Sequence, residues 1–256
     1  MNEPFSPLKL EPAYRKVAAV LTARITDGAL QPGERLPAEL ELARQLGVHR
    51  STIREALREL ESAGLLRRER GSKLMMVSRP DRIAVASGVT RALTLHQATV
   101  AEVWETMTII EPEVAELAAR RRRREDLAVL SAVVADAEHH DTSQAAQQAA
   151  EFFRALATAA SNNVLSLSQE PLLQLLGSSL LRLIEAVPQA RSRIAAAQRR
   201  ILEAVERGDA AAARTWCEKH IRDYRRGFEL AGIDLGLPIA AAGGASLPSR
   251  TRSRKR

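Results

Sequence analysis

The stretch from Glu39 to Gly64 constrains the fold of this chain most, because two short amphipathic segments meet there at one glycine. Their apolar residues recur every three or four positions, as on one face of a helix: Leu42, Ala43, Leu46, Ile53, Leu57 and Leu60. Gly47 separates the segments and can adopt the positive φ of a tight turn. The pattern predicts two short helices, over residues 39–46 and 51–63, joined by that turn.

The front of the second predicted helix carries hydrogen-bond donors and cations, namely His49, Arg50, Ser51, Thr52 and Arg54. In a helix-turn-helix, this end of the second helix enters the major groove of DNA. An arginine there can contact guanine O6 and N7 together or clamp a phosphate, and hydroxyl groups suit phosphate oxygens. The sequence therefore predicts a DNA-reading helix. The alternative is a surface helix that begins with solvated polar residues.

Flanking segments complete a winged helix-turn-helix over residues 11–78. A helix that ends at Gly28 is predicted before the two short ones. Residues 65–77 predict a short β-hairpin, the wing, which turns near Gly71. Residues 1–10 are expected to form a flexible arm.

The rest of the chain has the apolar spacing of a helical bundle. Spacings of 4, 3, 4 and 3 mark one buried stripe: Val103, Met107, Ile110, Val114 and Leu117. Further helices are predicted near residues 125–139, 144–160, 169–186, 190–207 and 210–231. We expect a linker over residues 79–98 that is partly helical, an antiparallel all-α domain over residues 99–231, and a disordered basic tail over residues 232–256. The expected fold class is thus mainly α, with a β-hairpin wing in the N-terminal domain.

The net charge of +7 is uneven along the chain. Residues 1–78 carry +3 and residues 236–256 carry +5, whereas residues 79–235 carry −1. Basic ends suit a polyanionic partner such as DNA, although a basic tail is also typical of a solvated chain end.

Several classes of protein are excluded by what the sequence lacks. Cys217 is the only cysteine, so no intramolecular disulfide and no cysteine-rich metal site can form. The N-terminus has no signal-peptide pattern, and no apolar run approaches the ~20 residues that span a bilayer. No nucleophile elbow, P-loop or zinc-protease motif is present. We therefore expect a soluble, cytoplasmic protein that is not an enzyme, holds no cofactor and has no membrane partner.

Residues 36–65 resemble the N-terminal domain of the GntR family of transcription regulators. The matching motifs are Leu36-Pro37-x-Glu39-x-x-Leu42-Ala43, Gly47-Val48-x-Arg50-x-Thr52-Ile53-Arg54-Glu55-Ala56-Leu57-x-x-Leu60 and Gly64-Leu65. The resemblance implies that Arg50, Thr52 and Arg54 contact DNA, with Arg70 and Gly71 at the tip of the wing. The family often has a DNA-contacting arginine directly after the glutamate of the first motif. Here that residue is Leu40, which predicts the loss of one polar contact and a different operator choice.

Residues 99–230 are similar to the all-helical, FCD-type ligand-binding domain of the FadR subgroup of that family. The matching segments are Ile110-Glu111-Pro112-x-x-Ala115-x-Leu117-Ala118-Ala119, Phe152 to Asn162, Ile201 to Gly208-Asp209-x-x-Ala212, and His220-Ile221. Many members bind a divalent metal through an aspartate, a histidine four residues later and two further histidines. Transferred one at a time, these positions fall on Ala149, Phe153, Gln198 and His220.

Three of the four metal ligands are therefore absent, and a lone inward histidine is usually satisfied within a core. We expect no bound metal, and an effector pocket at Met107, Ala149, Phe153, Gln198 and His220 that is more apolar than in metal-binding members. Met107 stands where an arginine often meets a carboxylate effector. The small-molecule effector is expected to be less acidic, or longer-chained, than a metal-bound dicarboxylate.

The resemblance also implies a homodimer that presents two winged helices to double-stranded, palindromic operator DNA, most simply as an effector-controlled repressor. One alternative is an effector-independent regulator whose helical domain only dimerises, and another is an acyl-CoA-responsive member. Two further features have ordinary interpretations. Residues 120–124, all arginine, predict a solvated face, with DNA contact as the alternative. Trp216, Tyr224 and Phe228 predict core or dimer packing.

Overall fold

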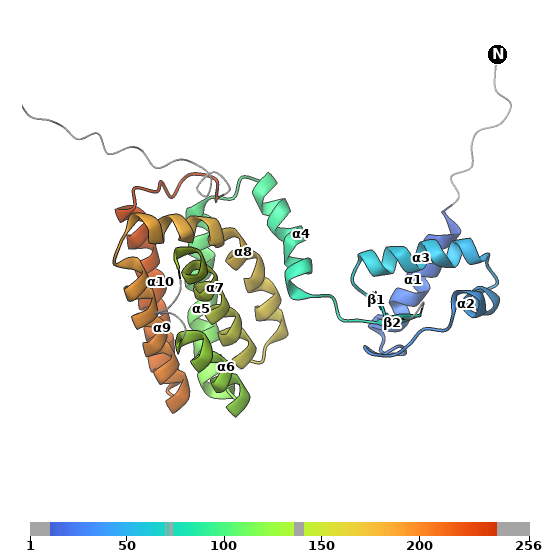
Figure 1. Cartoon of the computed structure of the whole chain (residues 1–256), viewed down its shortest axis with the longest axis horizontal. Coiled ribbons are helices and arrows are strands. Elements are labelled where there is room, and N and C mark those ends of the chain that lie inside the picture. The colour runs from blue at the N-terminus through green and yellow to red at the C-terminus, as the bar shows by residue number, and fades with distance from the viewer. Residues whose placement is uncertain (1–10, 70, 72–73, 136–140, 240–256) are drawn as a thin grey trace, which may run out of the picture. The chain divides into compact units, whose positions relative to one another are not determined.

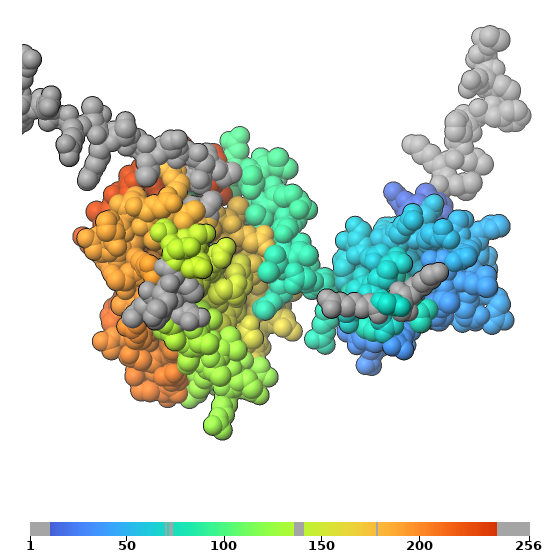
Figure 2. All heavy atoms as spheres, viewed as in Figure 1, coloured from blue at the N-terminus to red at the C-terminus, as the bar shows by residue number. Residues whose placement is uncertain are grey.

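A computed structural model describes residues 11–69, 71, 74–135 and 141–239 of the 256-residue chain. The chain divides into two compact units, residues 1–84 and 85–256 (Figures 1 and 2). Both are mainly helical, and the N-terminal unit adds a small antiparallel hairpin, so the predicted fold class is confirmed. Within the described ranges, every helix is too short or too polar to span a lipid bilayer.

The described part of the N-terminal unit contains the elements of a winged helix-turn-helix: α1 (Ala13–Thr26), α2 (Glu39–Leu46), α3 (Arg50–Ser62), β1 (Leu66–Arg68) and β2 (Met75–Val77). Leu66 pairs with Val77 and Arg68 with Met75 in the hairpin. The segment before α2 adds to this small sheet, because the Leu36 amide donates to the Met75 carbonyl at 2.8 Å.

Glycines end both short helices where the sequence predicts. Gly47 has φ +64° at the end of α2, and Gly64 has φ +74° just after α3, a conformation that glycine adopts without steric cost. The inward faces of the helices then share one apolar core with the hairpin: Val17, Ala18, Leu21, Leu36, Leu42, Ala43, Ile53, Ala56, Leu57, Leu60, Leu66, Met75 and Val77. This core holds α3 against α1 and fixes which face of α3 points outward.

The C-terminal unit is a bundle of long helices that run side by side (Figure 1). Its elements are α5 (Val100–Arg121), α6 (Arg124–Ala135), α7 (Thr142–Ala159), α8 (Asn163–Ala186), α9 (Ala190–Arg207) and α10 (Ala210–Leu230). Helix α5 is central, since it packs against α7, α8, α9 and α10. Helix α4 (Arg82–Leu95) begins at the division between the units and lies on the outside of the bundle, where most of its side chains are exposed (Figures 1 and 2).

Polar caps set where several bundle helices begin. The Thr99 hydroxyl accepts from the Glu102 amide at 3.2 Å, and the Glu102 carboxylate accepts in return from the Thr99 amide at 2.7 Å. Asp141 and Gln144 form the same reciprocal pair at the start of α7. Such a capping box satisfies amides that have no partner within the first helical turn, and each cap stabilises its helix by about 1 kcal/mol.

The start of the predicted disordered tail is wrong by at least eight residues. Ile233 and Ile239 are buried against the bundle core. The backbone between them covers the first turn of α5, where the amides of Val100 and Ala101 donate to the carbonyls of Leu237 and Leu235 at 3.2 and 2.9 Å. Helix α5 therefore needs this segment to satisfy its own free amides. Residues 240–256, and the predicted arm over residues 1–10, lie outside the described residues.

At residues 120–124 only Arg122 departs from the predicted solvated face, because it is half-buried while the other four arginines are exposed. Arg122 donates to the carbonyls of Ala119 and Glu206 at 2.7 and 3.3 Å, so it joins the end of α5 to the end of α9. Arg121 donates to the Ala160 carbonyl at 3.2 Å, and Arg123 pairs with Asp126 at 3.1 Å. These arginines satisfy backbone carbonyls and a cap at helix ends, which sequence spacing alone does not reveal.

Candidate functional site

The polar front of α3 lies on the surface of its unit, as the sequence predicts. Helix α3 starts at Arg50, directly after His49, and the side chains of His49, Arg50, Ser51 and Arg54 are exposed. Thr52 is half-buried. The opposite face is anchored in the core, so the exposed end cannot rotate inward without uncovering apolar surface. We call these five residues the reading tip.

A carboxylate on the neighbouring helix binds both arginines of the reading tip. Glu39, the first residue of α2, has one oxygen 2.9 Å from Arg50 Nε and 3.7 Å from Arg54 Nε. Its side chain is 27% exposed, against 60% for Arg50 and 49% for Arg54. The two ion pairs therefore limit the directions in which the Arg50 and Arg54 side chains point. Their guanidinium groups remain accessible to a duplex. The sequence motif contained Glu39 but gave no sign of this role.

Next to the tip lies an open hollow between α2 and the start of α3. Leu40 and Arg44 line one side, and Gly47, His49 and Arg50 line the other. Leu40 is 71% exposed, so an apolar side chain faces solvent where the family often has an arginine. At this position the surface therefore presents the methyl groups of a leucine to solvent, and not a cation.

The wing is described only in part. Gly71 is exposed with φ +77°, which suits a tight turn between β1 and β2. Arg70, the other predicted wing residue, lies outside the described residues. Arg67 and Arg68 on β1 are both exposed, and Arg68 lies 3.5 Å from Glu61 of α3.

In the bundle, the predicted effector residues come from four helices and do not all meet. Met107 of α5 and Ala149 and Phe153 of α7 line one apolar cavity. His220 of α10 lies beside Phe153, with ring centroids 5.7 Å apart and planes only 13° from parallel, and it lines a second hollow. Gln198 of α9 lines neither of these, and instead accepts from Gln148 Nε2 at 3.0 Å.

The donor set does not fit the metal of the related domains. Ala149 and Phe153 have no donor atom, and the Gln198 oxygen is engaged by Gln148. His220 is enclosed by the rings of Phe153 and Tyr224. Among the described residues, no three histidines, cysteines, aspartates or glutamates lie close enough together to share an ion. These residues therefore do not form the metal site of the related domains.

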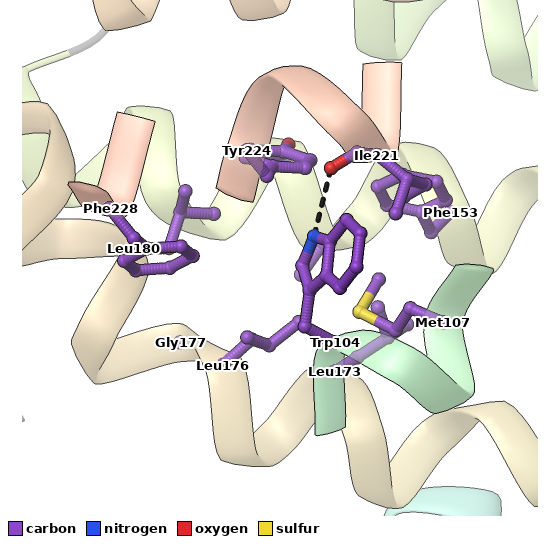
Figure 3. A pocket seen from close by; sticks show the side chains of 12 residues that line it. Trp104, Met107, Phe153, Leu173, Leu176, Gly177, Leu180, Ile221, Tyr224 and Phe228 are labelled. Atoms are coloured by element: carbon purple, nitrogen blue, oxygen red, sulfur yellow. Dashed lines mark hydrogen bonds between the residues drawn. The ribbon is translucent and has the colours of Figure 1, made fainter. Parts of the chain in front are cut away.

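The cavity is lined mainly by aromatic and aliphatic side chains (Figure 3). Its lining comes from α5, α7, α8 and α10: Trp104, Met107, Ala149, Ala150, Phe153, Leu173, Leu176, Gly177, Leu180, Ile221, Tyr224 and Phe228. Trp104 Nε1 is already satisfied, because it donates to the Ile221 carbonyl at 2.9 Å. The sequence pattern predicts ordinary packing for Tyr224 and Phe228. In the structure they line the cavity, together with residues of α8 that the sequence does not place next to α10.

The titratable groups behind this cavity are uncharged at neutral pH. Burial raises the pKa of the Glu111 carboxyl to about 8, an effect that the hydrogen bond from Gln169 offsets only partly. Burial lowers the pKa of His220 to about 4. Burial also raises the pKa of Tyr224 and of the Cys217 thiol. These four groups thus present no charge to the cavity at neutral pH.

Four buried polar atoms in the described interior have no protein partner: Glu111 Oε1, Gln198 Nε2, His220 Nε2 and Tyr224 OH. An unmade hydrogen bond at a buried atom costs about 1–3 kcal/mol, so native cores seldom keep several of them. Two of these atoms belong to α10, and the other two belong to its neighbours α5 and α9. This part of the bundle core therefore contains polar groups that a bound molecule could satisfy.

Comparisons with known proteins divide the chain in the same way. Residues 13–74 match the family described as bacterial regulatory proteins, gntR family, and residues 102–223 match the FCD domain. The chain is 48% identical over 60 residues to the histidine utilization repressor of Pseudomonas aeruginosa and 39% identical over 79 residues to the HTH-type transcriptional repressor NagR of Bacillus subtilis. These matches cover 23% and 31% of this chain, and 24% and 32% of the two relatives.

A solved structure extends the likeness over both units. A protein described as Streptococcus agalactiae GntR superposes with a TM-score of 0.60 at 27% identity, over 83% of this chain and 99% of that chain. The matches to the curated relatives are short, whereas the match to this structure extends over most of the chain and the FCD match covers the bundle. The chain therefore combines a gntR-family regulatory domain with an FCD domain.

Proposed function

We propose that this protein is a sequence-specific DNA-binding transcription regulator, most simply a repressor, that a small molecule controls through the FCD domain. The observation that carries the proposal is the reading tip, where exposed cations stand at the start of a helix whose other face is locked in a core. That arrangement is what major-groove recognition requires. The match to the gntR family supports the same interpretation of α3.

Four finer features are part of the proposal. Repression is supported by the matched relatives, both of which are described as repressors. We infer a homodimer, because one reading tip contacts a single half-site and a palindromic operator offers two. The FCD match and the four unpartnered polar atoms support an effector site in the bundle and a place in the FadR subgroup.

The proposal is tested on a duplex selected by the wild-type chain from a random pool. Arg50→Ala and Arg54→Ala are each expected to weaken binding by about 1–3 kcal/mol, roughly 5- to 150-fold, because each removes a base or phosphate contact of the reading tip. Fluorescence anisotropy with a labelled duplex measures the change.

Arg24→Ala is the matched control, because Arg24 is an exposed arginine on α1 of the same unit and its loss removes the same charge. We expect this variant to bind within about threefold of wild type. Equal affinities for wild type, Arg50→Ala and Arg54→Ala would remove the assignment of the reading tip.

A second candidate function is an effector-independent regulator whose bundle only dimerises. The size of the cavity favours it, since only about 20 Å³ is open to the centre of a water-sized sphere, which is room for about one water. Thermal unfolding across a metabolite library separates the two functions, because a true effector raises the unfolding temperature by mass action. A stabilising metabolite that also changes operator affinity supports the sensor.

A further inference from the structure

The apolar cavity in the bundle has a mouth on the surface between α7 and α8. Three of its lining residues, Ala150, Leu173 and Gly177, also line a wide surface groove between these two helices. The cavity and the groove therefore meet at these residues. Gly177 lies at the edge of the cavity in Figure 3, beside Leu176.

Gly177 has no ordinary structural reason to be glycine. It lies inside α8 with a helical backbone, where glycine costs about 1 kcal/mol relative to alanine. A Cβ added there would meet no atom within 4 Å, so the glycine does not make room for a neighbouring helix. What the missing side chain leaves open is the passage from the groove to the cavity.

The described lining of the cavity contains no charged side chain, and the only cation in the described lining of the groove is already ion-paired. Arg154 is the only cation among the described residues that line the groove, and it is already paired with Glu170 at 2.8 Å and Glu151 at 2.7 Å. Inside, Glu111 and His220 are neutral at pH 7. A charged ligand inside the cavity would therefore lose its hydration without gaining a counter-ion.

Binding requires the lining to move, and the lining is able to do so. The present opening is too small for a metabolite, whose sites usually span roughly 300–1,000 Å³. Met107, Leu173 and Leu176 have flexible side chains, and Ala150 and Gly177 leave room at the mouth. The unpartnered Tyr224 hydroxyl, on a side chain that is 7% exposed, offers a hydrogen bond to a polar group on the ligand.

From these observations we propose that the bundle takes an uncharged, largely apolar small molecule, which enters between α7 and α8 over Ala150 and Gly177. This inference rests on the proposed function in one respect, namely that the bound molecule acts as the effector of a regulator. The binding itself is independent of DNA.

Three probes with one ring system test the ligand class: 2-naphthol, which is uncharged at pH 7, the anion 2-naphthoate and the cation 2-naphthylmethylammonium. Trp104 lines the cavity, and in the full chain with Trp216→Phe it is the only tryptophan, so quenching of its fluorescence reports occupancy. We expect saturable binding of 2-naphthol, and binding of both ions that is about 100-fold weaker. The ligand class is overturned if either ion binds as tightly as 2-naphthol. It is also overturned if none of the three probes binds.

Substitutions test the mouth. Gly177→Leu fills the passage and should slow the association of 2-naphthol, followed by stopped-flow quenching of Trp104 fluorescence, by about tenfold or more. Gly88→Leu is the matched control, because Gly88 is also a helical glycine with no atom within 4 Å of an added Cβ, but it lies on α4 away from the mouth. Far-ultraviolet circular dichroism establishes that both variants fold. Equal rates of 2-naphthol association with Gly177→Leu and Gly88→Leu overturn the entry route.

Operator binding is measured on the same samples, which separates this inference from the proposed function. If 2-naphthol binds as described but wild type binds no DNA, the regulator proposal fails and the ligand inference stands. If DNA binding is normal and the probes fail, the ligand inference alone is overturned.

Discussion

At the scale of single residues, one carboxylate organises the surface that we propose reads DNA. Glu39 holds Arg50 and Arg54 by ion pairs that join two helices across the Gly47 turn. The arginines were predictable, because they follow a glycine at the front of an amphipathic helix. Their partner was not, since it is 11 positions before Arg50 in sequence and only the angle between α2 and α3 brings them together.

Glu39→Gln should raise the affinity for unrelated DNA and lower the preference for the selected operator. Removing a negative charge beside the duplex raises binding to unrelated DNA by about threefold, whereas the freed arginines lower the preference for the selected operator by about tenfold. Anisotropy with selected and scrambled duplexes gives both numbers. Glu41→Gln is the control, because Glu41 lies on the same helix but pairs with Arg44. An unchanged preference in Glu39→Gln would show that the ion pairs do not orient the tip.

A second residue, Glu111, predicts how stability depends on pH. Its pKa rises from 4.5 to about 8 in the folded chain, so the folded carboxyl keeps a proton that the unfolded chain releases. The free energy of unfolding therefore falls as pH rises through this window. His220, with its pKa lowered from 6.5 to about 4, gives the opposite slope, but only below about pH 6.5.

Between pH 6.5 and 8, wild type should therefore lose about 2 kcal/mol of unfolding free energy that Glu111→Gln does not lose. Urea unfolding at several pH values measures this difference. Glu105→Gln, an exposed position on α5, should follow wild type. Parallel pH profiles for wild type and Glu111→Gln would contradict a buried, protonated carboxyl.

At the scale of elements, helix ends were more predictable than the contacts between helices. Gly47, Gly64 and Gly208 end helices where the sequence places stops, because a left-handed residue favours glycine. The docking of Arg122 over the end of α9 was not foreseeable, because a run of arginines looks the same whether it is solvated or anchored.

Gly208→Ala tests that docking. Gly208 has φ +73°, and an added Cβ would lie 2.6 Å from one nitrogen of the Arg122 guanidinium. Gly232→Ala, at φ +69° with no atom within 4 Å, carries the backbone cost alone, about 1 kcal/mol. We expect Gly208→Ala to cost about 1 kcal/mol more than Gly232→Ala, measured by urea unfolding, because the guanidinium must shift. Equal losses of unfolding free energy in the two variants would mean that the Arg122 side chain moves aside without cost.

At the scale of the whole molecule, two units with different tasks share one chain, and α4 follows the wing directly. Helix α4 is tied to the bundle through Thr90, whose hydroxyl donates to Gln174 of α8 at 2.9 Å. Gln174 also lines the groove at the mouth of the cavity. A ligand that displaces α8 would therefore act on the helix that leads to the DNA-reading unit.

The division into a winged helix-turn-helix and a helical bundle followed from glycine positions and apolar periodicity, which are local signals. The cavity could not be predicted in the same way, because its lining comes from four helices and depends on how α8 packs against α10. The place of residues 232–239 was missed for a similar reason. Their glycines and proline look like those of a tail, and only the free amides of α5 explain why they are bound.

The central claim is that the reading tip selects DNA sequence, and selection from a random duplex pool by wild type and by Arg54→Ala tests it most directly. The account predicts an enriched palindrome for wild type, and for Arg54→Ala the same palindrome with preference lost at one base pair in each half-site. Identical enriched sequences from the two proteins, or no enriched sequence from wild type, would contradict it.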